Sequence, residues 1–254
     1  MVIGCALGGQ AQAQIVNVQQ LAGKPIKPGM TGQAALTADS LGGNSQLLTG
    51  GGSGTLFWRQ AAWLSLVMVT GAYGVKGTDG KWADDPYQAK IFEHLRVRRE
   101  LGDGLSVETF AQHEYDRWRR LKLRVVAGGG MRYDTDVGKG LHVAAGLAYM
   151  AQWEELLKPK AGDPLGLALE HRLSSYVVAA LELSETSALS LTAYVQPKLG
   201  DFSDLRGLVD AAIVLAAGKT VAVRLNWAVG YDTRPPASVR GYDTTGKFAL
   251  VLGF

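Results

Sequence analysis

Apolar and polar side chains alternate with a period of two residues along much of this chain. Between residues 221 and 232 the odd positions carry valine, leucine, tryptophan or tyrosine, whereas the even positions carry alanine, arginine, asparagine, glycine or aspartate. Residues 121–133 and 189–198 follow the same pattern. Because successive side chains of a β-strand point to opposite faces, the pattern predicts strands with one apolar face and one polar or small face. A membrane barrel with lipid outside and a polar lumen inside is the simplest account, although a soluble two-sheet sandwich would alternate in the same way.

Runs of this kind are separated by turn residues, and no convincing helix-period stretch interrupts them. They predict an all-β chain, a transmembrane up-and-down antiparallel β-barrel of about twelve strands. The expected strands are 32–40, 45–58, 63–75, 87–101, 105–115, 121–133, 141–153, 169–183, 189–198, 205–216, 221–232 and 242–254.

The lengths of the expected loops favour the membrane barrel over the sandwich. Several loops after odd-numbered strands are long, including 76–86, 154–168 and 232–241, while those after even-numbered strands are mostly short. Membrane barrels with both chain ends in the periplasm show this asymmetry, with short periplasmic turns and longer external loops. Trp58, Trp63 and Tyr73 are expected in the interfacial aromatic girdles of such a barrel.

The C-terminal strand carries a further signal. Phe248, Leu250, Leu252 and Phe254 share one face of it, opposite smaller residues. A barrel must end on a strand that closes the sheet, and a terminal phenylalanine on such a strand resembles the signal that bacterial outer-membrane barrels present to their assembly machinery. The strand therefore predicts a Gram-negative outer-membrane location and the barrel assembly machinery as a partner.

The N-terminus resembles the end of a secretory signal. Residues 2–9 form an apolar run, and Ala11-Gln12-Ala13 is a small-x-small site that predicts cleavage before Gln14. A native apolar N-terminus is the alternative. We divide the chain into a signal peptide remnant at 1–13, a periplasmic lead-in segment at 14–29 that contains prolines and glycines, and an outer-membrane β-barrel at 30–254.

Composition narrows the remaining possibilities. The formal net charge of +3 is too small to indicate a nucleic-acid partner. Cys5 is the only cysteine and lies in the expected signal, so no disulfide framework is available. We find no metal-binding spacing, phosphate loop or dinucleotide fingerprint, and we expect no metal or cofactor.

Residues 94–133 resemble a known family, the DUF481 group of outer-membrane barrels, also called the salt-induced outer-membrane protein or YdiY-like group. The matching features are the stretches 110–116 (FAQHEYD), 121–124 (LKLR) and 127–132 (AGGGMR), with Gly42-Gly43-Asn44 where the family has a Gly-Asn turn. The likeness covers most of the chain after Gly29. It implies the barrel fold and the compartment, but the family has no established activity to carry over.

A set of polar residues falls on the predicted inner faces of three consecutive strands. Opposite charges on neighbouring strands can pair, and a narrow lumen screens each pair less than an open surface does. The set either lines a selective pore or forms a structural network that fills the lumen, because a barrel of about twelve strands lies between the filled and the open kinds. Its members are Arg96, Arg98, Glu108, Gln112, Glu114, Arg124 and Arg132.

Arg117, Arg119, Arg120 and Lys122 cluster beside Trp118 at the predicted outer end of a hairpin. Arginine binds phosphate through a bidentate fork, so this cluster is a candidate contact for lipopolysaccharide. A solvated polar loop is the alternative.

In barrels that process lipids, a histidine and a serine act beside an acid at the outer leaflet, so the histidines near the outer rim are candidate catalytic residues. His113 and His171 are expected there, and Ser174 and Ser175 follow His171. No nucleophile, base and orienting group stand at a recognisable spacing, so we do not expect an enzyme. The sequence predicts a monomeric outer-membrane barrel in contact with lipid, either a narrow pore or a plugged structural barrel. A lipid-modifying enzyme is the alternative function.

Overall fold

The computed structural model describes residues 26–43, 46–78, 81–138, 140–163, 166–218 and 220–253, with backbone only at 247, 249 and 251–253. The expected signal remnant and most of the lead-in segment lie outside these residues. Among the described residues, no helix is long and apolar enough to cross a membrane. The strands are β1 (Gly29–Leu41), β2 (Gln46–Gln60), β3 (Trp63–Thr78), β4 (Lys81–Trp82), β5 (Gln88–Gly102), β6 (Leu105–Asp116), β7 (Leu121–Gly138), β8 (Leu141–Leu156), β9 (Ala168–Ser184), β10 (Ser187–Lys198), β11 (Asp201–Ala216), β12 (Val221–Asp232) and β13 (Tyr242–Gly253).

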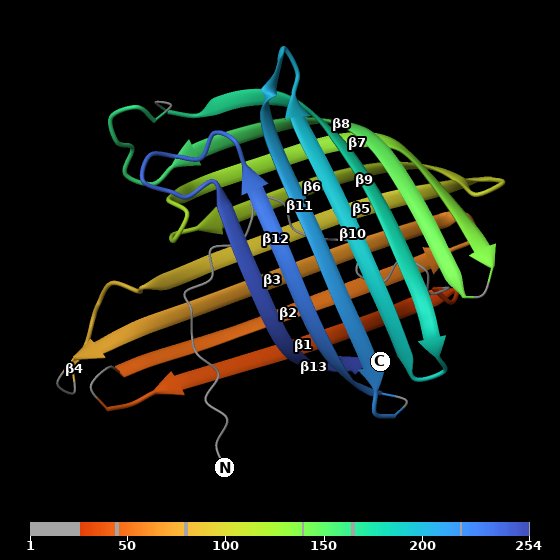
Figure 1. The fold of residues 1–254 in the computed structure, drawn as a ribbon, viewed down its shortest axis with the longest axis horizontal. Helices are drawn as coiled ribbons and strands as arrows, with labels where there is room; N and C mark the ends of the chain where they lie inside the picture. Colours follow the sequence, from red (N-terminus) through yellow and green to blue (C-terminus); the bar gives the residue numbers. More distant parts are fainter. Residues whose placement is uncertain are drawn as a thin grey trace.

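The strands form one antiparallel sheet in which, apart from the short β4, neighbours in the chain are neighbours in space (Figure 1). The first and last strands also meet, because Gln33 pairs with Gly253 and Ala34 with Leu252. The pairings therefore run round in a ring, and the predicted up-and-down barrel of about twelve long strands is confirmed. β4 is a two-residue strand that pairs with the end of β3, inside the loop expected at 76–86.

The two faces of the wall differ as the alternation predicted. Directly paired residues of antiparallel strands share a face, so the register assigns every strand position to the lumen or to the outside. On β12, Leu225 and Trp227 are exposed on the outer face, whereas Arg224 and Asp232 are buried on the inner face. On the outer surface, Trp58 and Trp63 flank the β2–β3 turn and Tyr73 lies toward the other end of β3, which are positions suited to two aromatic girdles.

Apolar side chains fill much of the lumen between the polar ones. One buried cluster contains Ala144, Tyr176, Val178, Tyr194 and Leu208, another contains Phe110, Val126, Ala148 and Met150, and a third contains Phe57, Leu64, Leu66, Met68 and Phe92. Inward-facing glycines make room for the largest rings. A Cβ on Gly146 would lie 2.3 Å from Cζ of Tyr176, so the tyrosine ring packs directly on bare backbone.

Candidate functional site

Glu108 on β6 is the centre of a charged cluster in the lumen. Its carboxylate accepts hydrogen bonds from Nη1 of Arg96 at 2.9 and 3.0 Å and lies 3.5 Å from Nη2 of Arg98, both on β5. The hydroxyl of Tyr176 on β9 donates a third bond at 2.8 Å. The Glu108 side chain is only 1% exposed, so these donors replace the water that a buried carboxylate loses.

The cluster extends along β7 and β8 through Arg132. Nη1 of Arg132 donates to the Tyr176 hydroxyl at 3.3 Å, and its other nitrogens bind the Asp134 carboxylate at 2.5 and 2.6 Å. The ring of His142 lies between Asp134 and Asp136, at 3.1 and 2.9 Å. Strands β5 to β9 are thus connected by one chain of polar contacts across the lumen.

A second charged cluster lies nearer the β6–β7 turn. Glu114 accepts from Arg119 at 3.1 Å and from Arg124 at 3.5 Å. Arg124 also donates to Oε1 of Gln152 at 2.8 Å, and Arg206 on β11 donates to the same oxygen at 2.9 Å. Because one amide oxygen accepts from two cations, acids must neutralise both, and Arg206 is paired with Glu154 and Asp232 at 3.3 and 3.2 Å.

Arg172 on β9 continues this second cluster toward β10 and β11. Its Nη2 lies 2.9 Å from Glu170 and 2.7 Å from Asp204. Glu170 also binds Nζ of Lys198 at 2.8 Å. The side chains of Arg132 and Arg172 are each 1% exposed, so they are almost completely shielded from water. The charged side chains of these two clusters are therefore paired with opposite charges.

The inner wall formed by β1 and β2 is different. Thr37 and Ser53 face the lumen, because Ser53 pairs with Ala35 and Thr37 with Gly51, on the same face as the buried Thr55. Both are nevertheless exposed. The side chains at Ala35, Thr37, Gly51 and Ser53 are small, and solvent reaches this strip of the lumen, whereas Phe57 farther along β2 is buried in the third apolar cluster.

All seven residues predicted to line the lumen face it. The structure joins Arg96, Arg98 and Glu108 directly and connects Arg132 to them through Tyr176. Glu114 and Arg124 belong to the second cluster, and Nε2 of Gln112 lies 3.0 Å from Nδ1 of His94. The alternation at 221–232 already places Asp232 on the polar face. The sequence did not single out the rest of the network, although the same period of two extended to β8, β9 and β11 would have found it. The missed residues are Gln152, Glu154, Glu170, Arg172, Tyr176, Asp204 and Arg206.

Three loops at one end of the barrel, the end predicted to be external, are tied together by Arg120. Its guanidinium donates to the carbonyl oxygens of Ala237 at 2.6 Å and Lys158 at 2.8 Å, and to the Asp163 carboxylate at 2.5 Å. The amides of Lys160 and Ala237 also donate to Asp163. The bond from Arg120, together with these amides, lowers the pKa of the Asp163 carboxyl to about 2. We call Arg120 and Asp163 the loop latch.

Residues 34–254 match the model of the family described as "Protein of unknown function, DUF481". The chain belongs to this family. No curated protein matches it.

Solved structures similar to this DUF481 protein are outer-membrane barrels. The NanC porin is 8% identical with a TM-score of 0.51, over 88% of this chain and 98% of that one, which supports the fold alone. An anion-selective porin from Comamonas acidovorans is 10% identical with a TM-score of 0.42, over 89% and 98% of the two chains. The β domain of the Bordetella autotransporter BrkA is also 10% identical, with a TM-score of 0.42, over 90% and 99%.

The four cations predicted to contact lipopolysaccharide all have carboxylate partners in this DUF481 barrel. Arg117 pairs with Asp85, Arg120 with Asp163, and Lys122 with Glu155 at 2.8 Å. Arg119 is buried and pairs with Glu114, so it faces the interior instead of forming one surface cluster with the others. Lipopolysaccharide contact stays a prediction, and the structure leaves Lys122 and Arg117 as its more accessible members.

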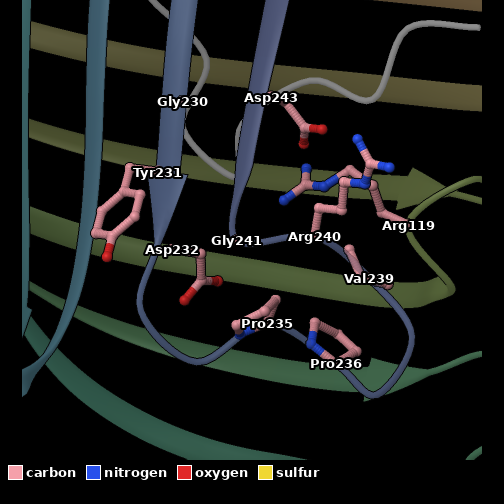
Figure 2. Close-up of a pocket in the computed structure, with 10 residues that line it drawn as sticks. All are labelled: Arg119, Gly230, Tyr231, Asp232, Pro235, Pro236, Val239, Arg240, Gly241 and Asp243. Atoms are coloured by element: carbon pink, nitrogen blue, oxygen red, sulfur yellow. The ribbon is translucent and has the colours of Figure 1, made fainter.

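A small pocket lies beneath the β12–β13 loop, at the same end of the barrel as the loop latch. In Figure 2 the side chains of Arg119, Arg240 and Asp243 converge on it, and Asp232 lines its other side. Cations and carboxylates are both present, so its charge is mixed. Within the described ranges, no group of three or more histidine, cysteine, aspartate or glutamate residues could hold a metal ion.

His171 and Ser174 do not come together. The register places His171 on the outer face, where Nδ1 lies 2.5 Å from the Tyr149 hydroxyl, and places Ser174 on the buried inner face, 3.1 Å from Nε2 of Gln196. His113 is also on the outer face, 2.9 Å from Glu93. Phe248 and Leu250 of the predicted assembly signal are exposed on the outer face, while Phe254 and the Leu252 side chain lie outside the described residues.

Proposed function

We propose that this chain is a bacterial outer-membrane barrel that forms a narrow pore, with the path for small hydrophilic solutes confined to the β1–β2 side of the lumen. The single observation that supports the proposal is the contrast between two inner walls. Thr37 and Ser53 face the lumen and are exposed, whereas the inward residues of β6 to β11 are mostly buried in ion pairs and apolar clusters.

The packed wall is unsuited to solute passage. A solute moving through it would have to separate pairs such as Arg96–Glu108 or Arg172–Asp204, and removing one partner of a buried pair costs about 3–5 kcal/mol. The small side chains of the β1–β2 strip need no such separation. The paired charges therefore stabilise the barrel, and the width of the open strip limits the size of the solutes that can pass.

The test is the conductance of the purified, refolded protein in a planar bilayer, in a Cys5→Ser background so that introduced cysteines stand alone. The Ser53→Cys variant should show stepwise increases in current as single pores open. Reaction of the cysteine with a bulky methanethiosulfonate reagent should then reduce the conductance. The matched control is Ser174→Cys, also on the inner face but buried in the packed wall, which should be unaffected. A folded but silent barrel, or equal block of both variants, would overturn the proposal and make a lipid-hydrolysis screen the next experiment.

A further inference from the structure

The seam between the first and last strands is much shorter than any other contact between the long strands. Among the described residues, β1 and β13 share two register pairs, Gln33 with Gly253 and Ala34 with Leu252. By contrast, β1 pairs with β2 from Gly29 to Leu41, and β13 pairs with β12 from Tyr242 to Leu252. Among the described strands, residues 35–41 of β1 and 242–251 of β13 therefore have ladder partners on one side only, and the two strands diverge from their contact in Figure 1.

Such edges are costly inside a membrane. Each unpaired backbone N–H or C=O in hydrocarbon costs several kcal/mol, so open edges persist only where they border water or acquire a partner. The exposed strip of Thr37 and Ser53 lies directly beside the open edge of β1. The open seam is therefore continuous with the solvent-accessible side of the lumen.

The sequence also fits a closed seam. Continuing the observed register places Thr37 opposite Ala249 and Asp39 opposite Lys247, which would bring opposite charges together on the inner face. On the outer face it places Leu36 opposite Leu250 and Ala38 opposite Phe248. Polar residues would meet inside and apolar residues outside, as a membrane wall requires.

We propose that this seam opens and closes, and that its open form admits the acyl chain of a membrane phospholipid to the β1–β2 strip of the lumen. The bilayer is the occupant that the surface favours, because the outer rims of the seam are apolar. Leu36 is 86% exposed, and Phe248 and Leu250 are exposed on the facing strand. On the inner side, the strip carries the small residues Ala35, Gly51 and Ser53, so a hydrocarbon chain entering beside them would meet no charged pair.

The first experiment tests whether the seam closes in the predicted register. In a Cys5→Ser background, Thr37→Cys with Ala249→Cys should form a disulfide on mild oxidation in phosphatidylethanolamine/phosphatidylglycerol vesicles, while the off-register pair Thr37→Cys with Val251→Cys should not. Heat-modifiable migration on gels identifies the folded fraction of each variant. Equal cross-linking of both pairs, or none of the first pair in folded protein, would overturn the proposed register.

The second experiment tests lipid entry with the same vesicles carrying a fluorescent phosphatidylethanolamine. p-Benzoylphenylalanine replaces Ser53 on the open strip, Ser190 on the inner face of the packed wall, or Leu191 on the lipid face. Irradiation should label the Ser53 variant and the Leu191 variant with lipid, but not the Ser190 variant. Oxidising the Thr37→Cys/Ala249→Cys pair should lower labelling at position 53 to the Ser190 level and leave position 191 unchanged.

Absence of lipid at position 53, or labelling that the disulfide does not alter, would overturn the lateral opening. The lateral opening and the pore can be tested independently of each other. Ion conductance with no lipid labelling supports the pore alone, whereas lipid labelling in a silent barrel supports the lateral opening alone.

Discussion

The hydroxyl of Tyr176 donates a 2.8 Å hydrogen bond to the Glu108 carboxylate, which joins β9 to β6 across two intervening strands. A ladder of backbone bonds connects each strand only to its neighbours. This side-chain bond instead connects two strands that are not neighbours in the sheet. It makes the interior a structural element of the barrel.

Tyr176→Phe should destabilise the barrel while leaving the ring in place. The variant loses the hydrogen bond to Glu108 and the one accepted from Arg132, and a hydrogen bond to a charged group contributes about 1.5–3 kcal/mol. The urea midpoint of the refolded protein in detergent should fall. Tyr133→Phe, on the exposed outer face, is the control and should leave the midpoint unchanged. Equal midpoints for the two variants would show that the buried bond contributes little.

Gly146→Ala should destabilise by about 1–3 kcal/mol, the usual cost of overpacking. The new Cβ would lie 2.3 Å from Cζ of Tyr176, which is buried and has little freedom to move. Gly54→Ala is the matched control, since a Cβ there would meet nothing within 4 Å. The fall in urea midpoint caused by Gly146→Ala should be smaller in a Tyr176→Leu background than in the wild-type protein, because the crowded ring is absent there. A double variant whose losses simply add would argue against this contact.

The loop latch should weaken in acid. The pKa of Asp163 is lowered from 3.8 to about 2, so its contribution is complete above about pH 4 and is lost as the pH falls through about 2. Hydrogen exchange of residues 157–163 and 233–241, corrected for the intrinsic rate, should show protection that disappears over this range. Asp163→Asn should lack the protection at every pH. Protection in the wild-type protein that persists below pH 2 would contradict the role of the carboxylate.

Lipopolysaccharide retention distinguishes a phosphate contact from a solvated loop. Replacing Arg117 and Lys122 with serine should reduce the lipopolysaccharide that co-purifies with the barrel, because these two cations are the accessible ones. Lys81→Ser, another exposed cation, provides the control. Unchanged retention in the double variant would favour the solvated loop.

Deleting Phe254 should impair membrane assembly without altering the lumen. The terminal strand is the one that closes the ring with β1, and its final residue is the predicted recognition signal. The amount of folded barrel in the membrane fraction, identified by its heat-modifiable migration on gels, is the quantity to measure. Phe202→Ser, an exposed phenylalanine at the start of β11, should assemble normally. Normal assembly of the deletion variant would remove the basis for the signal.

The sequence by itself determined the strands and the direction of their side chains. A period of two residues depends on local backbone geometry alone, so residues such as Trp227 and Arg224 could be assigned to opposite faces, and the charged positions from Arg96 to Arg132 to the lumen. The turn residues are also local features, and they predict the strand order because each hairpin places a strand beside the one before it.

Only the tertiary structure decided which inward residues meet. Glu108 and Tyr176 are 68 residues apart, and their contact depends on the curvature of the closed sheet, which no local pattern records. The structure likewise separated Arg119 from its neighbours in sequence, buried it beside Glu114, and left Thr37 and Ser53 exposed on the same inner surface. The short β1–β13 seam has the same origin, because pairing between the two ends of a chain depends on how all the strands between them tilt and close.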